Sequence, residues 1–406
     1  MSDNNVSRFS GEWETKQLGE LASIRNQKVM PENVDPNTSC VELEHIASGI
    51  GHLLENSTAE YSTASKYRFF AGDVLFGRLR SYLRKYWLAD HNGICTTEIW
   101  PLMVDAKQID SGFLHAIVQT DEFFAMANLS YGTHMPRADW TVMRNFSIML
   151  PPIQEQRAIA EVLSDVDGLI NALDALIAKK RAIKQATMQQ LLTGKTRLPG
   201  FSGAWETKRL GEIGEISGAG VNKKINANEE SVRLVNYLDV YNKTFLYSKD
   251  LMHQVSARSD QVRRCAVEKG DIFFTPSSEV PDDIGCSAVA MEDVPDGVYS
   301  YHVVRLRLKV DWDLYFRAYA FDTNEFLNQA SRQCDGSGTR YVISLPKFRA
   351  MTVRFPSTIE EQRAIATVLS DMDAEITALE QRKDKTIAIK QGMMQQLLTG
   401  KVRLVK

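Results

Sequence analysis

The sequence lacks the motifs of the enzyme classes that a chain of this size most often represents. Its seven histidines show no HExxH or other metal-ligand spacing, and there is no GxSxG nucleophile elbow. The Asn/Asp-Pro-Pro-aromatic tetrapeptide of amino-methyltransferases and the acidic box of helicases are also missing. We therefore expect no catalytic residues, and we expect that the chain catalyses nothing on its own.

Two glycine-containing segments match nucleotide-binding loops only in part. The segment LLTGKT ends like a phosphate-binding loop, but Gln189 occupies the position of the first required glycine, and the segment ends a helical pattern instead of starting one. In SGAGVNKK, Gly218 and Gly220 begin a dinucleotide fingerprint whose third glycine is missing. Neither segment predicts a bound cofactor, so we expect none on this chain.

Paired cysteines and long apolar runs are missing as well. The five cysteines are scattered, odd in number and without a CxxC pair, which favours reduced thiols over a zinc site. No apolar run approaches the roughly 18 residues of a membrane span, and the N-terminal segment has no apolar core. We expect a soluble, cytoplasmic protein without a membrane partner. The cysteines are Cys40, Cys95, Cys265, Cys286 and Cys334.

Length and charge set further bounds. A chain of 406 residues with 44% hydrophobic content can form two to four domains with substantial cores. The net charge of -3 is close to neutral, so no basic field covers the whole molecule. Any surface that binds nucleic acid must therefore be local.

The dominant feature is an internal repeat. Residues 154–197 match residues 360–403 without a gap, at an offset of 206, with 28 identities in 44 positions. Proline precedes each copy, acidic residues occupy the first turn, and Gly194 and Gly400 stand where a helix would end. Each copy therefore predicts one long helix of about 60 Å, which needs a partner helix because a small domain cannot bury it.

Apolar residues in the two copies follow the spacing of a coiled-coil seam, with occasional longer steps. An ordinary amphipathic helix packed on a core has a similar stripe, but it would not explain the identical charged positions. We predict that the two helices pair with each other through these residues. The stripe is Val162, Val166, Leu169, Leu173, Leu176 and Ile183 in the first copy, and Ile365, Leu369, Met372, Ile376 and Leu379 in the second. Of these, we assign to pairing and docking Val162, Val166, Leu173, Leu176, Ile365, Leu369, Met372 and Leu379.

A second repeat shows that the whole chain is two tandem halves. FSGEWETKQLGEL at residues 9–21 matches FSGAWETKRLGEI at residues 201–213, at an offset of 192. The offset drifts between the two repeats, so the globular parts contain insertions whereas the helices are kept alike. We predict four parts: globular domains at 1–150 and 199–355, and long helices at 151–198 and 356–406.

Each globular part mixes strand and helix patterns, which predicts an α+β or α/β domain without fixing the strand order. Strands are expected at VLFGRLR, ICTTEIWPLMV and FSIMLP in the first half, and at VRLVNYLDV, DIFFTP, YHVVRLRLKV and AMTVRFP in the second. One amphipathic helix is expected over 111–129, and another over 313–331.

Local basic and hydroxyl clusters are the candidates for DNA contact. FGRLRSYLRKYW places cations among aromatic residues, a combination suited to phosphate contact, although a solvated strand face has the same composition. GTHMPRADW and GSGTRYVISLPK occupy equivalent places, and each is either a base-contacting loop or a plain glycine turn. In the second half, FFTPSSEVPDD replaces the arginine cluster with hydroxyls and carboxylates. The candidates are Arg78, Arg80, Arg84, Lys85, Thr133, His134 and Arg137 in the first half, and Ser277, Ser278, Thr339, Arg340 and Lys347 in the second.

Two variable halves that each open with W-x-x-x-x-L-G-E and end in an EQ...LLTGK helix resemble the specificity subunit of Type I restriction-modification enzymes, over essentially the whole chain. The resemblance implies two target recognition domains on double-stranded DNA, with the long helices paired antiparallel as a spacer and as a docking surface for partners. It also implies two methyltransferase subunits and motor and nuclease subunits as partners. S-adenosylmethionine, ATP and magnesium would belong to those partners. One departure is that Pro356-Ser357 stands where the first copy has Pro151-Pro152.

Independent physical reasoning agrees with this function. Each half can recognise only a few base pairs, and two halves on a spacer would recognise a two-part site with a separation of about one helical turn, ~34 Å. Because the halves differ, the target should be asymmetric. One alternative is a coiled-coil adaptor that gathers proteins without touching DNA. Another, disfavoured by the missing motifs, is a nuclease or methyltransferase fused to its own DNA-recognition domain.

Overall fold

The computed structural model describes residues 12–55, 57–129 and 135–404, and the chain divides into two compact units. The first unit consists of Met1–Ala175 and Glu380–Lys406, and the second of Leu176–Leu379. Each unit therefore contains one globular part together with part of both long helices. The division between the units lies within the two helices. It does not test the domain boundaries predicted at residues 150 and 355, which remain a prediction.

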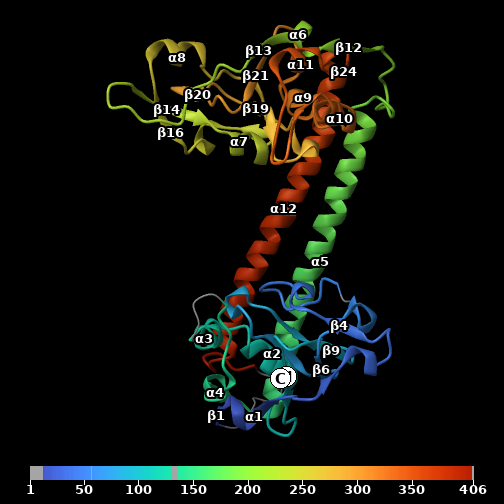
Figure 1. Ribbon diagram of the computed structural model, residues 1–406, viewed down its shortest axis with the longest axis vertical. Helices are drawn as coiled ribbons and strands as arrows, with labels where there is room; N and C mark the ends of the chain where they lie inside the picture. The colour runs from blue at the N-terminus through green and yellow to red at the C-terminus, as the bar shows by residue number, and fades with distance from the viewer. Residues whose placement is uncertain (1–11, 56, 130–134, 405–406) are drawn as a thin grey trace, which may run out of the picture. The chain divides into compact units, whose positions relative to one another are not determined.

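The two long helices are confirmed. They are α5 (Ile153–Leu191) and α12 (Ile359–Leu397), each 39 residues long and each unbroken in Figure 1. Inside each unit, ion pairs join them so that residue numbers rise along α5 as they fall along α12, and the helices therefore run antiparallel there. The pairs are Asp167–Lys390 (2.6 Å) and Asp174–Lys383 (2.8 Å) in the first unit, and Lys180–Glu375 (2.7 Å) and Lys184–Asp373 (2.5 Å) in the second.

Two of these ion pairs explain why charged positions are identical in the two helices. Asp167 and Asp373 are equivalent under the offset of 206, and so are Lys184 and Lys390. Each aspartate pairs with the lysine of the other helix copy, so one interaction occurs twice, once in each unit. The repeat thus carries a register-setting contact that needs one residue from each copy.

The predicted apolar seam is partly wrong. Leu173, Ile365 and Leu369 are buried as expected, but Leu176 is 38% exposed, and Leu169 and Ile183 are also exposed. The buried apolar residues of α5 are Ala158, Ile159, Leu163, Ile170, Leu173, Ile177, Met188 and Leu191. Seam spacing alone missed this set because the helix ends pack into the globular cores as well as against each other. Val162, Val166, Met372 and Leu379 are half-buried.

The first unit contains three small sheets. β1 (Glu14–Gln17) pairs with β11 (Ser147–Leu150), just before α5 begins. The second sheet has the order β2 (Ala22–Ile24), β10 (Ile99–Val104), β7 (Val74–Gly77) and β8 (Tyr86–Leu88). The third has the order β3 (Lys28–Val29), β6 (Lys66–Phe69), β9 (Gly93–Thr96), β4 (Ser39–Val41) and β5 (Ser57–Thr58).

The second unit repeats this plan with additions. β12 (Trp205–Arg209) pairs with β24 (Thr352–Pro356), as β1 pairs with β11. A five-stranded sheet has the order β13 (Gly214–Ser217), β21 (Val304–Leu308), β17 (Ile272–Phe274), β19 (Ser287–Ala290) and β15 (Phe245–Leu246). Two three-stranded sheets complete it: β16 (Gln254–Ala257), β14 (Glu230–Val235) and β20 (Gly297–Tyr299), and β18 (Ser277–Ser278), β23 (Arg340–Val342) and β22 (Asp335–Ser337). The mixed fold class is confirmed.

The single helices expected at 111–129 and 313–331 are each two helices. The first is α2 (Ser111–Ile117) followed by α3 (Asp121–Ala127), and the second is α9 (Leu314–Tyr319) followed by α10 (Asn324–Gln333). In both halves a threonine caps the second helix: Thr120 accepts from the backbone N–H of Phe123, and Thr323 from that of Phe326. The first turn of a helix leaves backbone N–H groups without an acceptor, and a threonine hydroxyl can accept from one of them. A threonine can therefore start a new helix inside a continuous apolar pattern.

The strand expected over 232–240 is also shorter. β14 ends at Val235, and α7 (Tyr237–Asn242) follows. Asn236 caps α7, since its side chain accepts from the backbone N–H of Tyr237, and its own N–H donates to Asp239 at 3.0 Å. The remaining short helices are α1 (Leu18–Leu21), α4 (Trp140–Met143), α6 (Leu210–Ile213), α8 (Ser259–Arg264) and α11 (Leu345–Ala350).

Each unit builds its main core from its globular part and from the ends of both long helices. In the first unit, Ile159 at the start of α5 and Leu397 at the end of α12 join the core with Phe113 and Phe123. In the second unit the roles of the helices are exchanged, because the core takes the end of α5 and the start of α12. The counterparts of Leu397 and Ile159 in that core are Leu191 and Ile365.

A buried ion pair fastens the helix ends in each unit. Glu155 at the start of α5 is fully buried, and Arg403 beyond α12 donates two hydrogen bonds of 2.6 Å to its carboxylate. The Arg403 guanidinium also lies over Trp13, 5.7 Å from the ring centroid. We call this set the first closure cluster. It explains why the glutamate, the arginine and the tryptophan all recur.

The second closure cluster repeats these contacts. Arg197, beyond α5, donates to both carboxylate oxygens of Glu361 at the start of α12, at 2.5 and 2.7 Å, and its guanidinium lies over Trp205. The residue after each glutamate is a buried glutamine that bonds the proline preceding the helix. Gln156 donates to the carbonyl of Pro151, and Gln362 to that of Pro356. The replacement of the second proline by Ser357 leaves this contact in place.

Candidate nucleic-acid interface

The sequence candidates fall on two equivalent loop pairs. In the first unit the loop after β7 meets the segment before α4, through a bridge between Leu79 and Arg137. In the second unit the loop after β17 forms β18, which pairs with β23. Clusters that are far apart in sequence are thus brought together in each unit.

A strained turn presents the arginine cluster of the first unit. Arg80 and Arg84 adopt φ values of 49° and 51°, in the left-handed region that non-glycine residues rarely enter. They flank a 3-10 turn at Ser81–Leu83 whose Tyr82 is 54% exposed. The backbone N–H of Arg80 donates to the carbonyl of Pro136 at 2.8 Å, which ties the turn to the neighbouring segment. Strain of this kind costs of order 1 kcal/mol and concentrates at functional sites.

The cations of this cluster are not equivalent. Arg84 pairs with Asp121 and lies over Phe124, and Lys85 donates to the carbonyls of Leu43 and Ile46 at 2.7 and 2.9 Å. Their charges already have partners within the unit.

The other candidate arginines of the first unit also differ in whether their side chains have partners. Arg137 pairs with Glu98 at 2.7 Å, and Arg78 lies over Trp100 with a buried Nε that has no partner among the described residues. Arg80 is exposed, and its side chain forms no hydrogen bond or ion pair within the described ranges. Arg80 is therefore the candidate with the most available charge. Thr133 and His134 lie outside the described residues, so nothing tests them.

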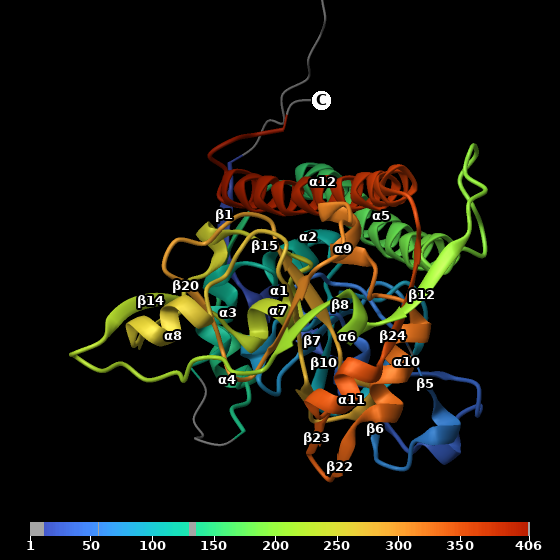
Figure 2. The same cartoon turned by 90° about the horizontal axis from the view of Figure 1, so that it is seen from above.

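The second unit presents a hairpin in place of the arginine turn. β22 and β23 form it, and Figure 2 shows them beside α11. Gly336 is needed there, because a Cβ at this position would lie 2.2 Å from the carbonyl oxygen of Arg340. Thr339 and Arg340 are exposed at the tip, and Ser277 and Ser278 line the neighbouring strand. Lys347 of α11 already pairs with Asp335 at 2.6 Å.

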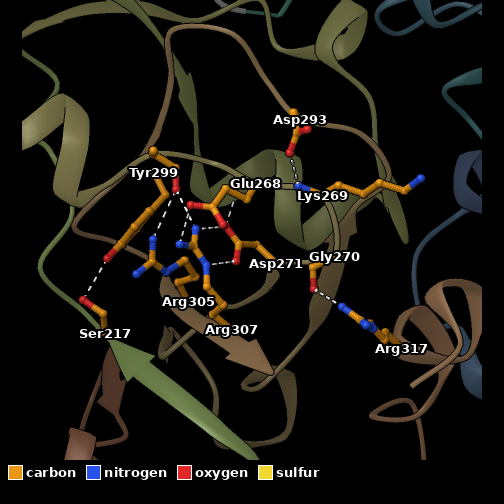
Figure 3. Close-up of polar contacts among 11 residues, drawn as sticks. Ser217, Glu268, Lys269, Gly270, Asp271, Asp293, Tyr299, Arg305, Arg307 and Arg317 are labelled. Carbon is orange, nitrogen blue, oxygen red and sulfur yellow. Dashed lines mark hydrogen bonds and ion pairs between the residues drawn. The ribbon is translucent and has the colours of Figure 1, made fainter. Parts of the chain in front are cut away.

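A polar network at the start of β17 serves the fold. Figure 3 shows Arg307 against Asp271, with hydrogen bonds of 2.7 and 2.8 Å, and against Glu268. The first unit repeats this contact with Asp73 and Arg25, at 2.7 and 2.9 Å. Both aspartates belong to the repeated Gly-Asp motif at the start of the central strand. Because these charges are satisfied internally, they support the strand and its loop and are not candidates for DNA contact.

Sequence analysis did not single out two basic residues of the second unit, Lys223 and His302. Lys223 is exposed and His302 half-buried, and neither makes a side-chain hydrogen bond or ion pair in the described part of the chain. Burial lowers the pKa of His302 below its usual value, and the positive charges of Lys223 and Arg340 lower it further. No sequence signal could have found these two residues, because they are widely separated along the chain and share no motif.

The fold and its sites define a class: a duplicated chain whose two recognition-type domains are built onto antiparallel helices. The family model for the Type I restriction modification DNA specificity domain matches residues 10–185 and again residues 203–388. The chain belongs to this family, and it is a DNA-recognition subunit of a Type I restriction-modification system. The adaptor alternative is therefore not favoured.

Similarity to individual proteins agrees with this assignment. The chain is 22% identical to the Type I restriction enzyme MjaVIII specificity subunit of Methanocaldococcus jannaschii, over 98% of this chain and 94% of that protein. It is 24% identical to the EcoDI specificity subunit of Escherichia coli, over 53% of this chain and 48% of that one. The solved S subunit of a Type I system from M. genitalium has the same fold, with a TM-score of 0.57 at 15% identity and 98% of each chain covered. A chain solved in a study of complex assembly and conformational transition of the type I R-M system gives a TM-score of 0.59 at 17% identity, over 96% of this chain and 98% of that one.

Within the described ranges, no helix is long and apolar enough to cross a membrane.

Proposed function

We propose that the two halves recognise the two parts of an asymmetric, bipartite DNA target. The observation that carries this proposal is that equivalent loops have different chemistry. The first half presents Arg80 on a strained arginine turn, whereas the second presents Ser277, Ser278 and Arg340 on a hairpin sheet. Arginine favours guanine, whereas a serine hydroxyl can bind either a hydrogen-bond donor or an acceptor on a base edge. The two different loops should therefore select different bases.

The chain recognises DNA and leaves catalysis to partners. In this proposal two methyltransferase subunits and the motor and nuclease subunits dock on the specificity subunit, and S-adenosylmethionine, ATP and magnesium bind to them and not to this chain. Exposed apolar residues on α5 support docking of a partner helix. Leu169, Leu176 and Ile183 are 42%, 38% and 43% exposed and recur at seven-residue steps, which places them along one helix face.

The phosphate contact of the first half is tested at Arg80. Arg80→Gln removes a charge that has no partner among the described residues, so we expect weaker DNA binding and a fall of about 0.9 in the slope of log affinity against log salt. Fluorescence anisotropy with a labelled duplex over a salt series measures both, using the full chain assembled with its methyltransferase subunits.

Lys107→Gln is the matched control, because Lys107 is an exposed lysine of the same unit away from the strained turn. Its slope should equal that of the unaltered chain. An Arg80→Gln slope that also stays unchanged would remove Arg80 from the interface. DNA binding of the unaltered complex that does not depend on salt would count against the proposed function as a whole.

A further inference from the structure

The loop between β17 and β19 of the second unit has one open strand edge. We call residues 275–286 the hydroxyl loop, because they include the two serine candidates on β18. β18 pairs with β23 so that Ser277 lies opposite Val342, and the backbone N–H of Ile343 donates to the carbonyl of Pro276 at 2.9 Å. Because the hydrogen bonds of an antiparallel pair alternate, the N–H and the carbonyl of Ser277 point away from β23.

The helix that follows β14 reaches this open edge. The Tyr237 hydroxyl of α7 donates to the carbonyl of Ser277 at 2.9 Å, and the Tyr241 hydroxyl donates to the carboxylate of Asp283 at 2.6 Å. The two tyrosines are about one helical turn apart, and their rings lie nearly parallel, at 14°, with centroids 6.0 Å apart. The two hydroxyls therefore hold the hydroxyl loop at β18 and again near its far end.

α7 is a packed support for these two side chains. Val240, which lies between the tyrosines on the helix, is 1% exposed and belongs to the core that includes strands β14, β16 and β20. Beyond the helix, Lys243 pairs with Asp239 at 3.5 Å and donates to the carbonyl of Asp250 at 3.1 Å. The tyrosine hydroxyls thus have positions that are set by a different sheet from the one that carries the hydroxyl loop.

The first unit holds its arginine turn from the equivalent place. β4 corresponds to β14, because each lies between one parallel and one antiparallel neighbour in its sheet. In the segment after β4, the N–H of Gly49 donates to the carbonyl of Arg84 at 2.8 Å, and the Ser48 hydroxyl donates to the carbonyl of Leu83. The donors differ in chemistry, but in both units the segment after this strand fixes the backbone of the candidate recognition loop.

The second half depends on such positioning more than the first. An arginine has its own preference for guanine, since its guanidinium matches two acceptors on that base, whereas a serine hydroxyl can bind a donor or an acceptor. A serine therefore discriminates between bases only if it is held where one base edge fits and another does not. The backbone of β18 determines where its serine hydroxyls lie.

We propose that Tyr237 and Tyr241 are positioning residues for base recognition by the second half. This role rests on the DNA-recognition function proposed above, and it assigns to that function two residues outside the candidate loops. The tyrosine hydroxyls act through β18 and not on the DNA. Their removal leaves the serines in place along the chain but frees the strand that carries them, so the second half accepts more bases.

The test measures methylation by the full chain assembled with its methyltransferase subunits, with S-adenosylmethionine that carries a labelled methyl group. One duplex contains the motif found methylated in cells, and two others contain a single substituted base pair, one in each part of that motif. The readout is discrimination, which is the methylation rate on the intact motif divided by the rate on a substituted duplex. Loss of folded complex lowers both rates alike and leaves this ratio unchanged.

Tyr237→Phe keeps the ring and removes only the hydroxyl. We expect discrimination to fall roughly three- to tenfold for one part of the motif, the range that one hydrogen bond supports, and to stay unchanged for the other part. Tyr241→Phe should lower the same ratio by less, because its acceptor lies beyond β18 in the loop.

Tyr315→Phe is the matched control. Tyr315 is a 46% exposed tyrosine of the same unit whose hydroxyl makes no hydrogen bond in the described part of the chain. Both of its discrimination ratios should equal those of the unaltered chain. An equal fall in Tyr315→Phe and Tyr237→Phe would overturn the assignment, because the loss would not depend on the contact with β18.

Unchanged ratios for Tyr237→Phe, or equal losses for both parts of the motif, would also overturn the positioning role. A fall in all rates at constant ratio would do the same, since it would show a loss of folded complex alone. In each of these cases, methylation of a bipartite motif by the unaltered complex leaves the DNA-recognition function standing. If the unaltered complex methylates no such motif, the proposed function fails and the positioning role fails with it.

Discussion

At the scale of single residues, the closure clusters connect sequence identity to a physical requirement. Glu155 has no exposed surface and Glu361 only 3%, and an unpaired carboxylate at such depth would cost several kcal/mol. Arg403 and Arg197 supply two hydrogen bonds each from beyond the end of the other helix. If either residue of such a pair were replaced alone, the charge of its partner would be left uncompensated. Both residues are therefore kept in each copy of the repeat.

Arg403→Met should destabilise the first unit and leave the second intact. It leaves Glu155 buried and uncompensated, at a cost of roughly 3 kcal/mol. Arg197→Met is the matched variant, with the same effect confined to the second unit. Hydrogen exchange followed by mass spectrometry, resolved along the chain, reports each unit separately. Equal loss of protection in both units after either change would contradict this assignment.

The same scale shows what a sequence can predict about a site. The arginine turn and the glycine hairpin were found because their residues are neighbours in the chain. Which arginine has a free charge could not be predicted, because Asp121 and Glu98, the partners of Arg84 and Arg137, lie in other elements.

At the scale of elements, the long helices were predictable and their packing face was not. Length, caps and repetition are local signals, and α5 and α12 lie within the expected ranges. The seam was misplaced because α5 carries two apolar stripes. One includes Leu173 and is buried, and the other includes Leu176 and is exposed, although both residues fit a heptad.

That difference can be measured with two substitutions of the same kind. Leu173→Asp places a carboxylate at a side chain that is 4% exposed, so we expect a loss of roughly 3 kcal/mol or more in the free energy of unfolding. Leu176→Asp, on the exposed stripe, should cost less than about 1 kcal/mol. Denaturant unfolding of the full chain compares them. Similar losses for the two variants would show that the exposed stripe is also part of the fold.

The exposed stripe then has a separate expectation at this scale. If it docks a methyltransferase helix, Leu176→Asp should weaken assembly even though the chain stays folded. Analytical ultracentrifugation of the chain mixed with methyltransferase subunits reports this directly. Full assembly with Leu176→Asp would exclude that face, and docking would have to be sought elsewhere.

At the scale of the whole molecule, the chain is one plan used twice with different surfaces. Each unit closes with the same glutamate-arginine-tryptophan cluster, the same aspartate-lysine register pair and the same aspartate-arginine support for its central strand. The loops carried by that strand differ, with arginines in the first unit and hydroxyls with a hairpin in the second. Constant scaffolds with variable loops are what a modular recognition subunit requires.

The central claim is that each half recognises its own part of the target. The measurement is sequencing of methylated DNA from cells carrying the complete system, with the unaltered chain and with a chimera in which residues 12–150 come from another specificity subunit. We predict an asymmetric bipartite motif for the unaltered chain, and for the chimera a motif with one part replaced and the other kept. A chimera that changes both parts, or an unaltered chain that yields one continuous motif, would contradict the account.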